Sequence, residues 1–421
     1  MSKRRYATVD CKQVDWSALA AKVTGERLVV AIDVAKEDFV AALQCVAEQT
    51  LVRVKWRHPQ QTAEWLAGIE QLRRAVAVEA VMESSGVYGD ALRWQLEQRA
   101  VAVYRVSAKG VHDSAESYDG VASLHDAKAS EIIAKLHWEG RSRRWAPLSA
   151  SRRGALAQVR WLGDCKARER VEAGRLEALL SRHWPEALVI LGVHSVALLQ
   201  LLADYGSPAQ VAALAHPARA RLRRAGGAAL SWEKIDALLA SAGQTLGVPC
   251  VAEERALLCR QAQQLLGAHR AVREAERALL KVSAEDPAYA AMPAPLGAVT
   301  AAVLLATAGN PADYPSARAY CKGLGLNLKE QSSGRHRGPL HITKRGPPTA
   351  RFYLYFAALR LIARDPVIKC WFARKSARPG AVKLKQVVEL MRKLAKAIWH
   401  QARGEPFDVN RLVNLPAVAQ P

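Results

Sequence analysis

The chain has 421 residues, half of them apolar, and carries a formal net charge of +22 with a pI of about 10.0. This length allows two or three domains. Such a basic balance excludes an ordinary neutral metabolic enzyme and indicates a polyanionic partner, either nucleic acid or an anionic membrane. The charge belongs to a folded region, because residues 316–403 hold 20 Lys and Arg against three acids, Glu330, Asp365 and Glu389.

Membrane and secreted classes are disfavoured. The longest apolar stretch, residues 187–205, contains His194, Ser195 and Gln200, so it is expected to be a buried helix. Residues 1–16 lack the apolar segment of a signal peptide. The seven cysteines are scattered without metal-finger spacing and indicate reduced thiols in the cytosol. Nucleic acid is therefore the expected partner, in a bacterial, nucleoid-associated setting and away from the membrane.

Strand-like and helical patterns alternate in the first third of the chain. Residues 1–24 are expected to form a loosely held arm, after which residues 27–46 predict two strands and residues 49–58 a third. The next segments predict a helix, a buried strand, a helix and a strand, at residues 60–76, 77–83, 89–100 and 101–108. This order, β-β-β-α-β-α-β, is that of the ribonuclease-H-like (RuvC-like) α/β fold.

The remainder of the chain is predicted to be mostly helical. Residues 151–184 and 251–285 are amphipathic patterns longer than typical globular helices, which suggests a coiled-coil or paired-helix insertion. Residues 349–375 and 381–400 predict basic amphipathic helices, and residues 404–421 a tail. The expected divisions are an arm, a RuvC-like domain, a helical region, a C-terminal domain and a tail, at 1–24, 25–147, 148–290, 291–403 and 404–421.

Carboxylates stand where predicted strands end. Asp33 ends the first strand, Glu83 ends the strand after the first helix, and Asp126 opens a later predicted helix. Two carboxylates held together repel each other unless a divalent cation lies between them, and hard oxygen ligands suit Mg²⁺ or Mn²⁺. The alternative is that they are turn or cap residues. The other acids nearby are expected to be solvated: Asp113, Glu116, Asp119 and Glu131.

These motifs resemble one family. "AIDVAK", "ESSGVYG", "HDAKAS" and "GLGLNLKEQSSGRHRG…ITKRG" are similar, in order, to motifs of the DEDD insertion-sequence transposases, the IS110 group and its relatives the Piv-type DNA invertases. The resemblance covers roughly residues 26–400. It implies a RuvC-like domain, a coiled-coil insertion and a C-terminal transposase domain with a serine nucleophile. It also implies donor and target DNA as substrates and a structured bridge RNA that pairs with both.

The resemblance assigns roles residue by residue. Asp33 matches the first-strand aspartate, Glu83 the glutamate of the E-[ST]-[ST]-G motif, and Asp126 the second aspartate of K-T-D-x-x-D-A. Ser333 matches the serine of the S-G motif. The first aspartate of K-T-D-x-x-D-A is replaced by Ser123.

Three explanations of this replacement remain open. Either three carboxylates suffice as ligands, or Ser123, His125 or Asp119 replaces the missing carboxylate through water, or the element is damaged.

The segment from Lys329 to Gly346 surrounds two serines with cations. A serine hydroxyl is a weak nucleophile unless it is activated or placed for in-line attack, and attack on a phosphodiester needs positive charge near the phosphate oxygens. Taken alone, the segment is equally compatible with a loop that only binds phosphates. The resemblance favours Ser333 as the nucleophile, with Ser332 as the local alternative.

Cationic side chains of this segment and of the last helix are predicted to bind nucleic acid. They are Arg335, Arg337, Lys344, Arg345, Lys383, Lys385, Arg392 and Lys393. The apolar faces of the two basic helices are expected to pack into a core. These faces are Phe352, Leu354, Phe356 and Leu359 in one helix and Val387, Leu390, Leu394 and Ile398 in the other.

Three functions remain in order of preference. The first is a bridge-RNA-guided transposase or recombinase that works as a dimer or tetramer. The second is a RuvC-like, metal-dependent nuclease or junction resolvase in which the serine segment only binds. The third is a catalytically inactive nucleic-acid-binding relative, motivated by Ser123.

Overall fold

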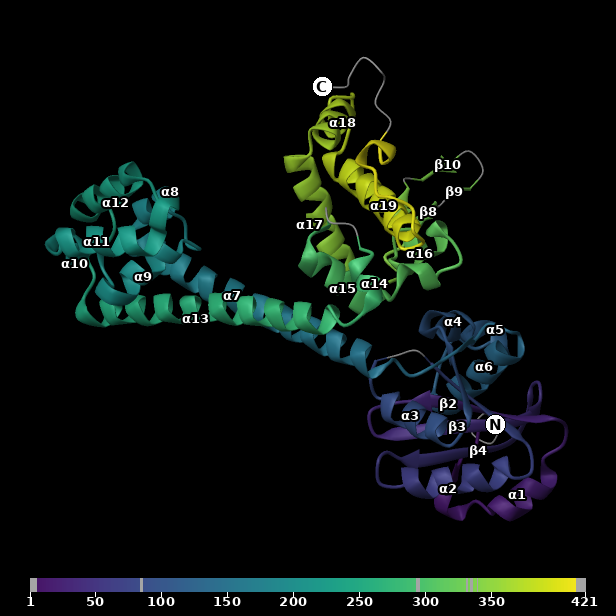
Figure 1. Ribbon diagram of the computed structural model, residues 1–421. Coiled ribbons are helices and arrows are strands. Elements are labelled where there is room, and N and C mark those ends of the chain that lie inside the picture. Colours follow the sequence, from purple (N-terminus) through teal and green to yellow (C-terminus); the bar gives the residue numbers. More distant parts are fainter. Residues whose placement is uncertain are drawn as a thin grey trace. The chain divides into compact units, whose positions relative to one another are not determined.

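The N-terminal part of the chain folds around a seven-stranded mixed sheet (Figure 1). The computed structural model describes residues 6–83, 86–292, 296–330, 332–333, 336–338 and 340–413. The chain divides into two units, residues 1–148 and 149–421. The strands of the sheet are β1 (Val9–Asp10), β2 (Arg27–Val34), β3 (Asp38–Val46), β4 (Gln49–Arg57), β5 (Ala77–Glu83), β6 (Ala102–Val106) and β7 (Arg143–Arg144).

The strand order along the sheet is β1-β4-β3-β2-β5-β6-β7. Strands β2, β3 and β4 run antiparallel to their neighbours in this group, whereas β5 and β6 continue from β2 in parallel. The predicted succession of three strands, helix, strand, helix and strand is therefore confirmed. An antiparallel start followed by a parallel continuation is the arrangement expected of a ribonuclease-H-like sheet.

Helices cover both faces of this sheet, because the central strand is apolar on both sides. Leu28, Val30 and Ile32 of β2 pack with residues from α1 (Trp16–Lys22), α2 (Thr62–Arg73) and α3 (Asp90–Gln98). The alternate residues Val29 and Ala31 face the other core, with residues from α4 (Ala108–Asp113), α5 (Ala115–Asp119) and α6 (Asp126–Trp138). The period of two along a strand thus assigns each residue to one layer.

The N-terminal segment differs from the loosely held arm that the sequence predicted. From Tyr6 onward it is attached to the sheet: Val9 pairs with Val54 of β4, and Cys11 and Leu19 are buried in the core. The physical reason is that β4 would otherwise be an open edge with unpaired backbone groups. Residues 1–5 lie outside the described residues.

Two long helices, α7 (Ala150–His183) and α13 (Ala252–Ser283), pack against each other in the second unit (Figure 1). Both predicted long helices are therefore confirmed. Leu162 and Cys165 of α7 share a core with Val272 and Leu279 of α13. Five shorter helices connect them: α8 (Pro185–Ile190), α9 (Val196–Tyr205), α10 (Pro208–Ala213), α11 (Ala215–Gly226) and α12 (Trp232–Gln244).

The apolar stretch at residues 187–205 is not the single buried helix that was predicted. It is divided between α8 and α9, and the turn between them contains Gly192, with a φ of +76°, and His194. Ser195 then caps α9 by accepting a hydrogen bond from the backbone N–H of Leu198. Glycine favours this left-handed conformation, and a serine N-cap begins a new helix, so local chemistry outweighs the apolar pattern.

The C-terminal region builds a further core from helices. They are α14 (Pro287–Ala290), α15 (Ala298–Ala308), α16 (Ala317–Gly323), α17 (Pro348–Arg364), α18 (Pro366–Ser376) and α19 (Lys383–Gln401). The predicted helix at 349–375 is two helices, because Asp365 ends α17 and caps α18 by accepting a hydrogen bond from the Ile368 N–H. Pro366 cannot donate the backbone hydrogen bond that would continue α17.

The predicted apolar faces of these helices fare differently. In α19 all four residues of the face, Val387, Leu390, Leu394 and Ile398, are buried as predicted. In α17 Leu354 is buried, but Phe352 and Phe356 are 54% and 42% exposed and lie edge to face against each other. Ala357 and Ala358 are among the α17 residues that are buried in the core instead.

Candidate active site

Asp33 and Glu83 stand at neighbouring strand ends. The parallel register of β2 and β5 pairs Ile32 with Met82, so Asp33 and Glu83 are the next residues along the two strands. The carboxyl ends of parallel strands meet at one edge of a sheet, which is where ligands bind in open α/β sheets. Both carboxylates therefore belong to the same edge.

Asp126 approaches this edge from a third element, as the first residue of α6. Burial, followed in size by the negative charges of Asp126 and Glu83, raises the pKa of Asp33 to about 7. A carboxylate affects the pKa of another in this way only when the two are close. The structure thus brings together the three acids that the sequence singled out.

A divalent cation fits this donor set. The three side chains offer hard carboxylate oxygens, the ligands that Mg²⁺ and Mn²⁺ prefer. The repulsion among them that raises the Asp33 pKa is the repulsion that a bound cation removes. These three acids are not a group in which one oxygen from each side chain lies within 4.8 Å of the others. They are therefore close enough to affect one another's charge, but their oxygens are not gathered around one point.

The serine segment is a two-step β-hairpin in the second unit. Its base pairs β8 (Leu328–Lys329) with β11 (His341–Ile342), and its outer part pairs β9 (Ser332–Ser333) with β10 (His336–Arg337). Ser333 lies opposite His336, and Ser332 lies opposite Arg337. Both serines are exposed. Because neighbouring residues of a strand point to opposite faces, the two hydroxyls lie on different sides of the hairpin.

Similarity to known proteins covers both regions. Residues 30–185 match the family model of DEDD transposases of the IS110 type, described as transposase, and residues 294–371 match that of the transposase IS116/IS110/IS902 family. An uncharacterized 43.6 kDa protein of insertion element IS110 from Streptomyces coelicolor is 26% identical over 255 residues, 59% of this chain. The chain spans 62% of the length of that curated relative. The chain belongs to the IS110 group of DEDD transposases.

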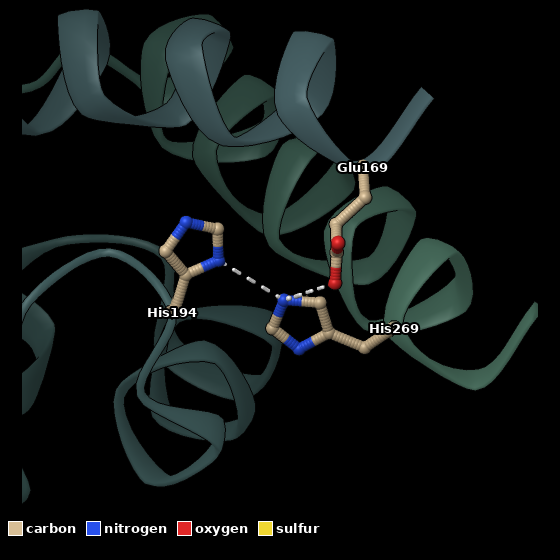
Figure 2. A group of neighbouring side chains, drawn as sticks. All are labelled: Glu169, His194 and His269. Atoms are coloured by element: carbon tan, nitrogen blue, oxygen red, sulfur yellow. Dashed lines mark hydrogen bonds and ion pairs between the residues drawn. The ribbon is translucent and has the colours of Figure 1, made fainter. Parts of the chain in front are cut away.

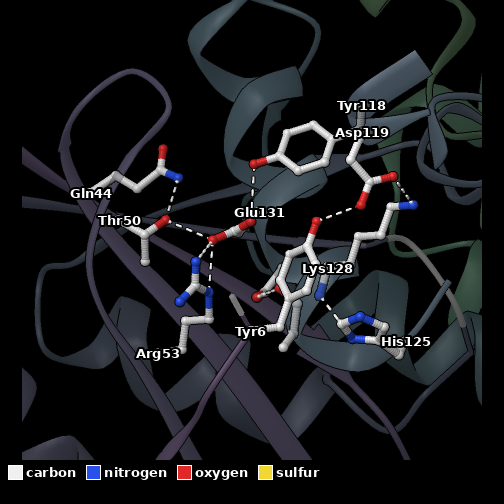
Figure 3. Close-up of polar contacts among 11 residues, drawn as sticks. Tyr6, Gln44, Thr50, Arg53, Tyr118, Asp119, His125, Lys128 and Glu131 are labelled. Carbon is white, nitrogen blue, oxygen red and sulfur yellow. Dashed lines mark hydrogen bonds and ion pairs between the residues drawn. The ribbon is translucent and has the colours of Figure 1, made fainter. Parts of the chain in front are cut away.

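In this IS110-group protein the buried Lys128 holds the segment that contains Ser123. Figure 3 shows this lysine beside Asp119 and His125. The Lys128 ammonium donates to Asp119 Oδ1 at 2.6 Å and to the backbone carbonyls of Val121 and Ser123 at 2.5 and 2.9 Å. The Tyr6 hydroxyl donates to the other Asp119 oxygen at 2.6 Å. These contacts shape the segment that leads into α6, and so they position Asp126.

Asp119 is therefore not the solvated acid that the sequence predicted. The hydrogen bonds from Lys128 and then Tyr6 lower its pKa to about 2, so Asp119 is ionised and paired with the lysine. A carboxylate used in this way is poorly suited to replace the missing fourth acid. The sequence analysis missed Lys128 and Tyr6, although Lys128 lies inside the "HDAKAS" motif two residues after Asp126.

Glu131 was also expected to be solvated, and this prediction is wrong. Only 5% of its side chain is exposed, and it forms an ion pair with Arg53 and accepts hydrogen bonds from Thr50 and Tyr118 (Figure 3). A carboxylate this buried requires such partners. Asp113 and Glu116, in contrast, are exposed as predicted.

Close backbone packing holds the base of the serine hairpin. A Cβ on Gly346 would lie 2.3 Å from the carbonyl oxygen of Gly323 and 2.7 Å from the nitrogen of Gly325. Lys344, with a φ of +55°, donates its backbone N–H to the Gly325 carbonyl at 2.9 Å. The Arg351 side chain donates to the Gly346 carbonyl at 2.8 Å. The glycines of "GLGLNL" and "ITKRG" thus allow two backbone segments to touch.

The predicted nucleic-acid-binding cations have different surroundings. Lys344 and Arg345 are exposed beside the hairpin base, and Lys383 and Lys385 are exposed in the first turn of α19. Arg392 and Lys393 are half-buried further along α19. Arg335 lies outside the described residues, as does the side chain of Arg337.

Within the described ranges, no helix is long and apolar enough to cross a membrane.

Proposed function

We propose that this protein is a DNA transposase of an insertion sequence that cuts DNA strands and rejoins them. The observation that carries this proposal is the meeting of Asp33, Glu83 and Asp126 in one field, in a chain of the IS110 group. The strongly basic balance supports DNA as the substrate, since a polyanion requires positive charge on its partner.

Asp33, Glu83 and Asp126 are proposed to hold Mg²⁺, or Mn²⁺ in its place. When bound, such an ion supplies positive charge beside the scissile phosphate and stabilises the oxygen that leaves it. The role of the chain is to keep three carboxylates at one sheet edge: two through the register of β2 and β5, and one through the start of α6.

Ser333 is proposed as the nucleophile. Its Oγ forms a bond to phosphorus while the bond from phosphorus to one deoxyribose oxygen breaks; the serine proton is given up, and the freed oxygen ends as a hydroxyl. The hydroxyl of a second DNA end then attacks the phosphoserine and releases the serine. The exposed position of Ser333 in the hairpin supports this role, as do the exposed cations Lys344 and Arg345 nearby.

The partners are proposed from the family. A bridge RNA would pair with donor and target DNA, and the acid site and the serine hairpin would meet within a dimer or tetramer. We propose that α7 and α13 form a coiled coil serving this assembly, within the divisions 148–290 and 291–403, and that the protein works at the bacterial nucleoid. Lys383, Lys385, Arg392 and Lys393 of α19 would bind phosphates together with the hairpin cations.

The test is strand cleavage of insertion-site DNA with Mg²⁺, comparing the wild type with Asp33→Asn. Loss of several kcal/mol of transition-state stabilisation predicts a rate decrease of about a thousandfold or more. Cleavage by the wild type that is unchanged in Asp33→Asn overturns the assignment of the acid site. Mg²⁺-dependent cleavage that survives replacement of both serines indicates a RuvC-like nuclease or junction resolvase. DNA binding without cleavage indicates an inactive relative.

A further inference from the structure

Three candidate metal ligands from distant parts of the sequence meet in the helical region (Figure 2). Glu169 comes from α7, His194 from the turn between α8 and α9, and His269 from α13. Among the described residues, they form a group in which one ligand atom from each side chain lies within 4.8 Å of the others. All three belong to the second unit, whereas the carboxylates of the candidate active site belong to the first.

Their spacing matches tetrahedral coordination. His269 Nε2 lies 3.3 Å from His194 Nδ1 and 3.4 Å from a carboxylate oxygen of Glu169. Ligand atoms placed about 2.0–2.1 Å from a tetrahedral Zn²⁺ are roughly 3.3 Å apart. Two of the three separations therefore already have the value that a shared ion would impose, without movement of the helices.

The surroundings favour an ion with one open coordination position. The side chains of His269 and Glu169 are 12% and 24% exposed, whereas His194 is exposed in its turn. Two imidazoles and one carboxylate are a donor set used by zinc enzymes that keep a fourth position for water. The negative charge of Glu169 favours a cation here, and the nearby Arg273 acts in the opposite sense.

We propose that Glu169, His194 and His269 form a binding site for a divalent transition-metal ion of the zinc class. The ion would join the α8–α9 turn to the two long helices. This turn is already defined by Gly192 and by the Ser195 cap of α9, so His194 needs little ordering to act as a ligand. The proposal does not depend on the transposase function, because it concerns different residues and a softer donor set than the three carboxylates.

The same geometry also fits a metal-free arrangement in which His269 shares protons with His194 and Glu169. The two arrangements differ in a measurable way. A metal site binds Zn²⁺ stoichiometrically and is stabilised by it, whereas a proton-sharing group responds to pH alone. The second arrangement is therefore an outcome that overturns the proposal.

The experiment is a calorimetric titration of the metal-free full-length chain with Zn²⁺, with Mg²⁺ in excess to occupy the carboxylates at the sheet edge. One Zn²⁺ per chain is expected, together with an increase in Tm. His194→Ala, His269→Ala and Glu169→Gln are each expected to weaken binding more than tenfold and to abolish the Tm increase. His194→Ala is the most informative variant, because this exposed turn residue can be replaced without disturbing a core.

Two controls separate this site from others. His216→Ala removes an exposed histidine of α11 and is expected to leave Zn²⁺ binding unchanged. Asp33→Asn, which removes a carboxylate of the other site, is expected to leave Zn²⁺ binding unchanged while Mg²⁺ is in excess, although it abolishes DNA cleavage. Binding of Co²⁺ should give an absorption spectrum without the thiolate band that ligation by one of the seven cysteines would produce. The proposal is overturned if the wild type binds no Zn²⁺, or if the His194 and His269 variants bind it with wild-type affinity.

Discussion

Asp33 and Glu83 occupy corresponding positions on two adjacent parallel strands, each one residue beyond the pair formed by Ile32 and Met82. Fifty residues separate them in the chain, and the sheet register alone makes them neighbours. The arrangement is unfavourable for the ionised acid by itself, because burial, and then the charges of Asp126 and Glu83, raise the pKa of Asp33. A costly carboxylate at the open edge of a sheet is more readily explained by function than by stability.

The pKa of Asp33 predicts how the stability of the metal-free protein depends on pH. A carboxyl with a pKa of about 7 in the folded chain and about 3.8 in the unfolded chain stabilises the fold only while it is protonated. Its contribution is complete below pH 4 and is lost as pH rises through 7. We therefore expect the free energy of unfolding to fall over this interval in the presence of a chelator, as measured by denaturant titration.

Asp33→Asn isolates this contribution. The difference in unfolding free energy between the variant and the wild type should increase from pH 4 to pH 7, because the amide does not ionise. Addition of Mg²⁺ should remove most of the difference by stabilising the ionised wild type. A difference that does not change with pH would contradict the shifted pKa.

The assignment of Ser333 predicts a covalent protein–DNA adduct. With a DNA substrate whose cut end cannot be rejoined, the wild type and Ser332→Ala should give a labelled band that survives denaturation. Ser333→Ala should give none, since the hydroxyl that bonds to phosphorus is absent. An adduct formed by Ser333→Ala but lost in Ser332→Ala would transfer the role to Ser332.

Lys128 is expected to be essential for the fold of the segment before Asp126. Lys128→Met removes the ammonium that pairs with Asp119 and donates to two backbone carbonyls, so the Tm should fall by several degrees. Replacing Asp119 by Asn as well should recover part of this loss, because the unpaired charge is removed. Thermal unfolding followed by circular dichroism measures both effects. If Lys128→Met had the Tm of the wild type, the ion pair would have no structural role.

The exposed lysines of α19 are expected to bind phosphate. Lys383→Gln together with Lys385→Gln should weaken DNA binding about equally for all sequences and reduce the salt dependence of log K by roughly two. Lys12→Gln, at an exposed lysine of the first unit, is the matched control and should have little effect. Affinities measured by fluorescence anisotropy at several salt concentrations test this, and an unchanged slope would exclude the two lysines from the interface.

Gly346 is expected to be required for the position of the serine hairpin. Gly346→Ala places a methyl group against the backbone of Gly323 and Gly325, which cannot move aside as a side chain can. The variant should remain folded through the helical core and yet lose adduct formation at Ser333. Gly380→Ala changes a glycine that has a positive φ and no neighbour within 4 Å, so it controls for backbone strain without a close contact. Equal activity of both variants would show that close packing at the hairpin base is not needed.

The sequence by itself determined the local structure and the identity of the three acids. Alternating apolar residues predicted the strands that end at Asp33 and Glu83, and helical periodicity predicted α7 and α13, because these patterns depend on a few neighbouring residues. Where capping chemistry intervened, as at Ser195 and Asp365, the apolar pattern predicted one helix and two were formed.

Only the tertiary structure decided which distant residues meet. The pairing of β1 with β4, the hold of Lys128 on Asp119, and the approach of His194 to His269 join segments whose spacing along the chain forms no motif. Such contacts depend on strand register and helix packing, which local periodicity does not specify. For this reason the carboxylates could be identified from the sequence, whereas the histidine cluster could not.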